Sequence, residues 1–183
     1  MSRSDEEFIK SSDVRARTAC HDAVMEFLST LENSGFSTWL RESNSIWGYP
    51  MILTLHTVGL ALLVGANTVL DLRLLGFAAR LPLEELSRAF RIMWIGFWIN
   101  AVSGAVLFAA DATTRGTSRL FIGKLFLVMF GVVVILAIRK QVFGETPDRP
   151  RVGATAKVLA VTSLAVWVAA ITAGRLMAYV YAS

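Results

Sequence analysis

The side chains that could do chemistry in this sequence are few, and most of them lie within long apolar stretches. His56 stands nine residues after Trp47, about 14 Å along a helix that begins there. An imidazole at that depth is too short to reach the aqueous boundary, but it can ligate a haem iron or another metal, or transfer a proton. His56 is therefore the first candidate for a functional group.

Three further ionisable residues come from other apolar stretches but from a similar depth: Asp111, Lys124 and Arg175. With His56 they supply one residue from each of four stretches, so all four could converge on one pocket. Lys124 and Arg175 could instead extend to lipid headgroups, with Asp111 as an ion-pair partner. Asp71 and Arg73 lie at the opposite end, where they form a charge cluster that would fix the depth of their helix.

Familiar catalytic and nucleotide-binding motifs are absent from the sequence. It contains no G-x-x-x-x-G-K-[ST] loop, no G-x-S-x-G motif, no Rossmann fingerprint and no Cys or His pair at zinc spacing. Because His56 is the one histidine in an apolar stretch, a haem held by two histidines cannot form within one chain. A second axial ligand would be water, a group from another subunit, or a methionine: Met93, Met129 or Met177.

The composition indicates what surrounds these residues. Of the 183 residues, 55% are hydrophobic and 17% are charged, and the mean hydropathy is +0.56. Soluble domains are about 45–50% apolar and about 25% charged. The numbers exclude an ordinary cytosolic enzyme and a disordered chain, and the single Cys20 excludes a disulfide scaffold.

Four apolar stretches are each long enough for a membrane-spanning helix, which needs about 20 residues. Pro50 suits the first turn of the first helix and Gly76 suits its end. A tight link around Pro82 and a polar stretch at 144–153 separate neighbouring helices. The sequence therefore predicts an all-α integral membrane protein, an up-and-down four-helix bundle over 47–183 with these spans: 47–75, 90–112, 120–143 and 155–181.

The N-terminal quarter differs from the bundle. Residues 1–17 are polar and predict a flexible tail. Segment 18–46 predicts an amphipathic helix that ends at Gly35 and lies in the membrane interface. Packing on the bundle or on a partner subunit is an equally good interpretation. The apolar stripe of this helix consists of Cys20, Val24, Phe27, Leu28 and Leu31.

The net charge of +4 and the pI near 9.6 could suggest a nucleic-acid partner. However, residues 1–46 carry five basic and eight acidic groups, a charge of −3, and the rest carries 13 basic and six acidic groups, a charge of +7. The basic residues gather in links between apolar stretches, which excludes a nucleic-acid groove. Two links hold nine of them: Arg73, Arg80, Arg88, Arg91, Arg139, Lys140, Arg149, Arg151 and Lys157.

The opposite side of the bundle holds five basic residues: Arg41, Arg115, Arg119, Lys124 and Arg175. By the positive-inside rule, the two richer links are cytoplasmic and both termini lie outside the cytoplasm. The chain begins with no charged n-region and apolar h-region, so no signal peptide is expected.

Four short segments of the sequence, taken together, resemble a known protein family: Leu55–Thr57, Asp71–Gly76, Leu107–Ala112 and Gly123–Leu125. The set resembles an uncharacterised family of bacterial four-span membrane proteins over residues 36–181. More distantly it resembles the copper-resistance protein D and HemJ-type protoporphyrinogen oxidase group. In that group a first-helix histidine and a third-helix lysine accompany haem b, and His56 and Lys124 occupy similar places. The resemblance implies the bacterial inner (plasma) membrane.

The first functional hypothesis is a haem-binding or redox-linked membrane protein. His56 would ligate a b-type haem, Lys124 and Arg175 would pair with the propionates, and Trp94 and Trp98 would line the site. No other cofactor or metal is expected. The chain lacks the further histidines and methionine-rich outer loops of the copper-resistance pattern, which argues against copper transport.

Two alternatives belong to other classes, and the sequence does not decide whether the chain is an enzyme. A small transporter or proton-linked channel would use a polar path: His56, Asn100, Asp111 and Lys124. A structural or accessory subunit would dock through the N-terminal segment onto a partner membrane subunit or a second copy of the chain. In every case the lipid bilayer is the main partner.

Overall fold

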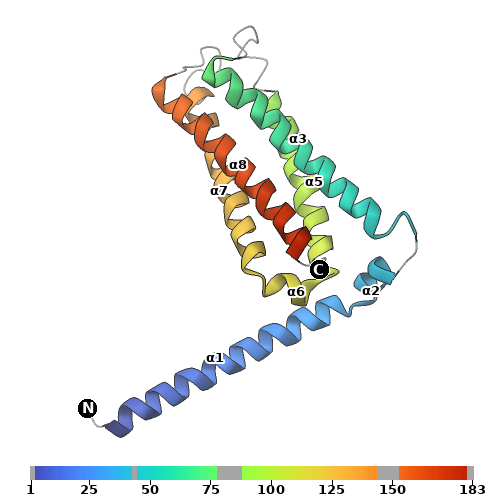
Figure 1. Cartoon of the computed structure of the whole chain (residues 1–183), viewed down its shortest axis with the longest axis vertical. Helices are drawn as coiled ribbons and strands as arrows, with labels where there is room; N and C mark the ends of the chain where they lie inside the picture. The colour runs from blue at the N-terminus through green and yellow to red at the C-terminus, as the bar shows by residue number, and fades with distance from the viewer. Residues whose placement is uncertain (1–2, 43–44, 78–87, 144–152, 181–183) are drawn as a thin grey trace.

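The computed structural model describes residues 3–42, 45–77, 88–143 and 153–180, and every regular element in these ranges is a helix. The result confirms the all-α prediction (Figure 1). The predicted links around Arg80 and Pro82 and around Arg149 and Arg151 lie outside the described residues. The helices are α1 (Arg3–Glu32), α2 (Gly35–Glu42), α3 (Tyr49–Leu75), α5 (Ala89–Ala109), α6 (Ala112–Gly116), α7 (Arg119–Phe143) and α8 (Ala154–Val180).

Helices α3, α5, α7 and α8 are each long and apolar enough to cross a membrane. Their bounds agree with the four predicted spans to within three residues. Large apolar side chains cover their outer faces, and Val102, Phe126 and Val168 are 61%, 73% and 64% exposed. Such a surface would be costly in water, at about 25 cal/mol per Å². The chain is therefore a multi-pass membrane protein.

Helix α3 begins and ends where its sequence indicates. Pro50 lies in its first turn, where no partner is needed for the missing N–H. Gly76 ends the helix with a left-handed φ of 99°, which favours glycine. The Gly76 N–H donates to the Arg73 carbonyl at 3.1 Å, and the Phe77 N–H donates to the Leu72 carbonyl at 3.0 Å. These two bonds form a Schellman motif.

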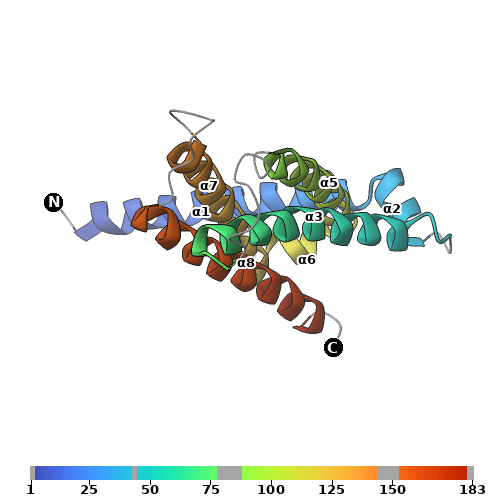
Figure 2. The same ribbon diagram turned by 90° about the horizontal axis from the view of Figure 1, so that it is seen from above.

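The four long helices are arranged as two pairs, α3 with α5 and α7 with α8, joined along a seam between α3 and α8. Figure 2 shows α3 between α5 and α8, whereas α5 and α7 lie apart. Gly59 and Gly96 let α3 and α5 meet backbone to backbone. A Cβ on Gly59 would lie 2.6 Å from the Asn100 nitrogen, and one on Gly96 would lie 2.6 Å from the Leu63 nitrogen.

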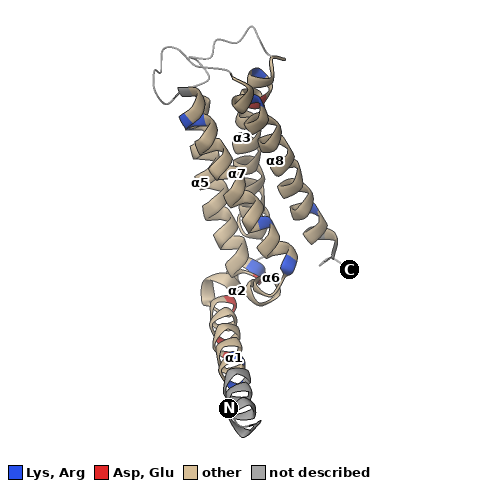
Figure 3. Cartoon of the chain, turned by 90° about the vertical axis from the view of Figure 1, so that its left-hand side faces the viewer, with Lys and Arg blue, Asp and Glu red and all other residues tan. Residues whose placement is uncertain are grey.

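Helices α1 and α2 contact the end of the bundle that carries α6, which we call the α6 end. Glu32 accepts hydrogen bonds from the Thr113 nitrogen at 2.9 Å and the Thr113 hydroxyl at 2.5 Å. Arg41 donates to the Ala110 carbonyl at 3.2 Å. The bonds from Thr113 lower the pKa of Glu32, and Arg41 adds to the shift. The rest of α1 projects away from the bundle (Figure 3).

One prediction for the N-terminal segment was wrong, and another stays a prediction. Residues 3–17 of the predicted polar tail lie in α1, whose start is favoured by the acidic residues of 5–7, and the flexibility of this tail stays a prediction. Gly35 does not end α1. The helix stops at Glu32, and the Ser34 hydroxyl accepts from the Ser37 nitrogen at 3.4 Å, as an N-cap does, so that α2 begins at Gly35.

The predicted apolar stripe contacts the bundle at one end only. Leu28 is buried at 7% exposure beside Gly116, whereas Val24 and Phe27 are 51% and 67% exposed. Only the last turns of α1 therefore contact the bundle. For the earlier part of the helix, a location in the membrane interface stays a prediction.

Candidate functional site

His56 lies on α3 and its ring packs against α5 near the α6 end. The ring nitrogen Nδ1 is 3.0 Å from the Asn100 carbonyl oxygen and 3.2 Å from the Ser103 hydroxyl. The Asn100 side-chain amide donates to the backbone carbonyl of His56 at 2.8 Å. The half-buried histidine is therefore held to α5 through both its ring and its backbone.

The hydrogen bonds define which nitrogen of the ring carries the proton. A carbonyl oxygen only accepts, so Nδ1 donates its hydrogen to Asn100, and Nε2 keeps a lone pair. The Ser103 hydroxyl donates to the backbone carbonyl of Ile99 and leaves its oxygen beside the ring. The nearest donor to Nε2 is the Asn100 amide, at the long distance of 3.5 Å. The lone pair of Nε2 is thus the reactive feature of this histidine.

Gly104 provides the space in which the ring lies. A Cβ at this position would approach the His56 ring to 3.1 Å at Cε1 and 3.4 Å at Nδ1, closer than ordinary contact. Because α5 presents Asn100, Ser103 and Gly104 on one face, it supplies the hydrogen bonds and the space together.

Positive charges from two other elements reach the same end. Lys124 of α7 and Arg115 of α6 both act electrostatically on His56, and Arg115 also acts on Lys124. The Lys124 side chain extends toward α8, where a Cβ on Gly174 would lie 3.5 Å from its Nζ. The structure therefore brings a cationic pair close to the imidazole, and Arg115 belongs to it although the sequence singled out only Lys124.

Two other predicted members of this group have separate places. Asp111 accepts from the Arg115 guanidinium at 3.2 Å, rather than from Lys124 or Arg175. Arg115 also donates to the Tyr49 hydroxyl at 3.3 Å. Arg175 is exposed on α8, one residue after Gly174. Asp111 therefore orients Arg115, and Arg175 faces the surroundings of the bundle.

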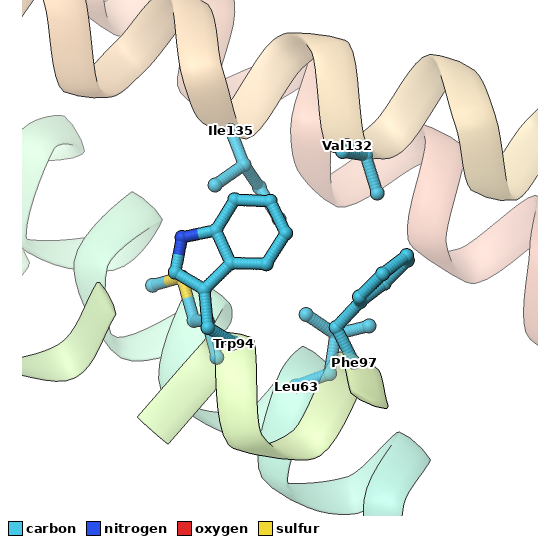
Figure 4. A pocket seen from close by; sticks show the side chains of 6 residues that line it. Leu63, Trp94, Phe97, Val132 and Ile135 are labelled. Atoms are coloured by element: carbon cyan, nitrogen blue, oxygen red, sulfur yellow. The ribbon is translucent and has the colours of Figure 1, made fainter. Parts of the chain in front are cut away.

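The predicted aromatic lining is not beside His56. Trp98 is 62% exposed on α5. Trp94 packs edge-on against Phe97 and lines a gap between the α3–α5 pair and α7 (Figure 4). The gap has only about 10 Å³ of space that a water molecule could occupy, far below the 300–1,000 Å³ of typical ligand pockets. Its walls are apolar: Leu63, Met93, Trp94, Phe97, Val132 and Ile135.

Asp71 belongs to a buried cluster that the sequence reading missed. It is fully buried, and the Asn67 amide donates to its carboxyl at 2.6 Å and to the Ser163 hydroxyl of α8 at 2.7 Å. Asp71 was predicted to form a charge cluster with Arg73. The carboxyl of Asp71 instead has neutral partners, and Arg73 is half-buried on the same helix. The four-residue spacing of Asn67 and Asp71 was the available signal.

The ligand chemistry of the α6 end is that of a single imidazole. Within the described ranges, no three His, Cys, Asp or Glu side chains gather in a way that could hold a bare metal ion. A single imidazole is therefore too few ligands for an isolated metal ion. A haem brings four ring nitrogens of its own and needs only one or two protein ligands.

Comparison with known proteins assigns the chain to a family. The chain has no significant match among curated proteins or among solved structures. The model of one protein family matches residues 46–180, the region from just before α3 to the end of α8. The chain belongs to this family, a family of unknown function (DUF6644).

Proposed function

We propose that this membrane protein binds a b-type haem through His56 and works in electron transfer or redox chemistry at the membrane. The hydrogen bond from Nδ1 to the Asn100 carbonyl carries the proposal. Histidines that ligate metals donate their other ring N–H to a carboxylate, a backbone carbonyl or water, which fixes the tautomer and raises the basicity of the ligating nitrogen. Nε2 of His56 is prepared in this way.

The charges around His56 support the same ligand. A haem carries two anionic propionates, and Lys124 and Arg115 supply positive charge at the α6 end, where Arg175 adds a third cation on α8. A bound haem would supply one-electron chemistry. The chain would hold its iron with His56, orient His56 with Asn100 and Ser103, and neutralise the propionates with the cations. Of the three methionines named as possible second axial ligands, Met177 of α8 lies nearest in sequence to one of these cations, and it is buried at 8% exposure.

An absorbance spectrum tests the proposal directly. The purified full-length protein should show a Soret band, as isolated or after haem addition, and His56→Ala should lose it. His21 is the matched control, because the chain has two histidines and this one is exposed on α1. His21→Ala should keep the band. A wild-type protein without a Soret band after haem addition contradicts the proposal.

The cation contribution has its own test. Lys124→Ala should retain the Soret band but release haem faster to a competing haem acceptor. Lys157→Ala is the matched control, because it removes one positive charge from an exposed position at the opposite end of α8. Equal release rates for Lys124→Ala and Lys157→Ala would remove Lys124 from the site.

A proton-linked channel or transporter is the second candidate. It is favoured by the polar chain that crosses from α3 to α5 through His56, Asn100 and Ser103. Asp111 and Lys124 would extend this path toward the α6 end. Proton flux in proteoliposomes that falls in His56→Ala and not in His21→Ala would support it, and flux that is unchanged in both variants would exclude it.

We also propose a bacterial inner-membrane location with both termini outside the cytoplasm. The support is the number of basic residues in the sequence, nine in the two links opposite α6 and five on the side of α6. Cys20 is the single cysteine and is exposed on α1, so it reports the position of the N-terminal segment. A membrane-impermeant maleimide should label intact spheroplasts. Labelling only after lysis would place α1 in the cytoplasm, and Cys20→Ser is the control.

A further inference from the structure

A second polar cluster lies in the seam between α3 and α8, away from the His56 site. Asn67 and Asp71 come from α3 and Ser163 comes from α8, and all three are 0% exposed. Asp71 stands fifteen residues after His56, about 22 Å farther along the helix. The two sites therefore lie in opposite halves of the membrane.

The partners of the Asp71 carboxyl are neutral. The Asn67 amide donates to Oδ2 at 2.6 Å, and Ser163 adds a side-chain hydrogen bond. The described charged residues around this end are Arg73 of α3, Arg88 and Arg91 at the start of α5, Arg139 and Lys140 of α7, and Lys157 of α8. Arg73 is half-buried and the other five are exposed, and none of the six contributes to the interactions found at the Asp71 carboxyl.

Within the described part of the chain, two buried oxygens of this cluster have no hydrogen-bond partner: Asp71 Oδ1 and Asn67 Oδ1. A buried acceptor without a donor costs about 1–3 kcal/mol, and more if it is charged. A free carboxylate oxygen within a membrane bundle is therefore the least stable feature of the cluster.

Oxygen atoms of this kind would bind either a proton or a small cation, and the geometry favours the proton. The side chains of the cluster offer four oxygens, from Asn67, Asp71 and Ser163, fewer than the six or more that hard cations take. The α-helical carbonyls nearby are used by their own helices. One proton on Oδ1, by contrast, removes the charge and turns the unpartnered acceptor into a donor.

We propose that Asn67, Asp71 and Ser163 form an intramembrane proton-binding site at the seam between the two helix pairs. The proton adds to Asp71 Oδ1 and converts the carboxylate to the neutral acid, with no other bond made or broken. Asp71 lies four residues before the end of α3 at Leu75, about 6 Å from that end. The site therefore exchanges protons with the aqueous side opposite α6.

Proton uptake changes how the two helix pairs are joined. With an ionised Asp71, the Asn67 amide must donate to both the carboxylate and Ser163, as it does in this structure. A protonated Asp71 donates a hydrogen bond of its own, which frees the amide to rearrange. The site thereby couples the proton concentration on one side to the packing of α3 on α8.

Infrared difference spectroscopy of the full chain in lipid vesicles tests the proposal. Wild type should show the carbonyl stretch of a protonated carboxyl group that shifts in D₂O and disappears as the pH rises. Asp71→Asn should lack this band. Asp22→Asn, on the exposed part of α1, should keep it. Retention of the whole band in Asp71→Asn, or no pH-dependent band in wild type, overturns the assignment.

Ser163→Ala keeps the test decisive if Asp71→Asn does not fold. The variant removes a donor that favours the carboxylate, so the band should persist to a higher pH, by on the order of one pH unit. A midpoint identical to that of wild type overturns the proposal. Sodium chloride at constant pH should not change the band. Loss of the band on sodium addition would assign a cation to the site instead.

Discussion

The two polar clusters of α3 share one helix but differ in everything that surrounds them. The His56 cluster is half-buried, faces α5 and has the cations Lys124 and Arg115 nearby. The Asp71 cluster is fully buried, faces α8 and has neutral partners. A group that must meet an anionic ligand benefits from the first environment, and a group that exchanges only a proton benefits from the second.

The contacts between helices explain the difference. Glycines let α3 and α5 meet backbone to backbone beside the His56 cluster, whereas the α3–α8 seam contains the buried side chains of Asn67, Asp71 and Ser163. The α3–α5 contact thus positions a ligand, and the α3–α8 contact contains a site that can change its hydrogen bonds.

The largest effect is expected where α3 and α5 touch. Gly59→Leu would force its side chain into the Asn100 backbone, where even a Cβ lies at 2.6 Å. We expect destabilisation of about 1–3 kcal/mol or more and loss of haem, measured by thermal unfolding in detergent and by the Soret band. Gly65→Leu is the matched control on the same helix, since nothing lies within 4 Å of its Cβ. Equal losses in both variants would show that the close contact is not special.

A pair of asparagine variants separates the two clusters. Asn100→Ala keeps the backbone carbonyl that accepts from the His56 ring and removes only the amide bond to the His56 carbonyl. It should therefore lower haem affinity by less than the roughly tenfold to hundredfold expected when the partner of the ring itself is lost. Asn67→Ala should leave haem affinity unchanged and alter the infrared band of Asp71. Haem titration and infrared spectra of both proteins provide the measurement. If each variant changed both haem affinity and the infrared band of Asp71, the two clusters would act as one.

A pair of serine variants compares the stabilities of the two contacts. Ser163→Ala removes the acceptor for one Asn67 hydrogen in a fully buried setting, and should cost about 1–3 kcal/mol. Ser103→Ala should cost less, on the order of 0.5–1.5 kcal/mol, because the carbonyls to which it donates have helical partners. Denaturation in mixed detergent measures both. If Ser103→Ala lost more stability than Ser163→Ala, the hydrogen bonds at the α3–α5 contact would contribute more to stability than those at the α3–α8 seam.

The smallest effect is expected from low pH acting on Glu32, which lies outside the four-helix bundle. Since the bonds from Thr113 lower the pKa of Glu32 in the folded chain, their stabilisation is complete above the ordinary value near 4.5 and is lost as the pH falls through the lower, folded value. Glu32 is partly exposed, so we expect less than about 1 kcal/mol.

The protection factor for hydrogen exchange at the Thr113 amide should therefore fall at acid pH, and Glu32→Gln should remove this dependence. Because α6 also carries Arg115, release of α1 should affect haem retention and leave the Asp71 band unchanged. An acid effect on the Asp71 band that Glu32→Gln abolishes would contradict this separation.

The spans, and the terminal signals of α3, were predictable from sequence because they depend on composition and on single residues. Pro50 and Gly76 mark the bounds of α3 by their own backbone geometry. The sequence also predicted the depth of His56, since depth is a matter of counting residues. The break at Asn33 and Ser34 was missed because Gly35 was interpreted as an end rather than as the residue after an N-cap.

The partners of each polar residue were not predictable, for a physical reason. A membrane helix that is apolar on all sides has no hydrophobic face, so its sequence does not show which side turns inward. Asn67 and Ser163 are 96 residues apart, and His56 and Asn100 are 44 apart. Only the rotation of each helix about its axis brings them together, and that rotation depends on close packing at residues such as Gly59 and Gly104.

The order of packing, α5 on α3, α3 on α8 and α8 on α7, has a mechanical consequence. The backbones of the four helices pack in this row, and α5 meets α7 only through side chains, such as Arg139 of α7 over the Phe90 ring of α5. Turning one pair against the other about the α3–α8 seam would break side-chain contacts but no backbone hydrogen bond. Such a hinge would open the gap beside Trp94 and would keep the imidazole of His56 on its own half.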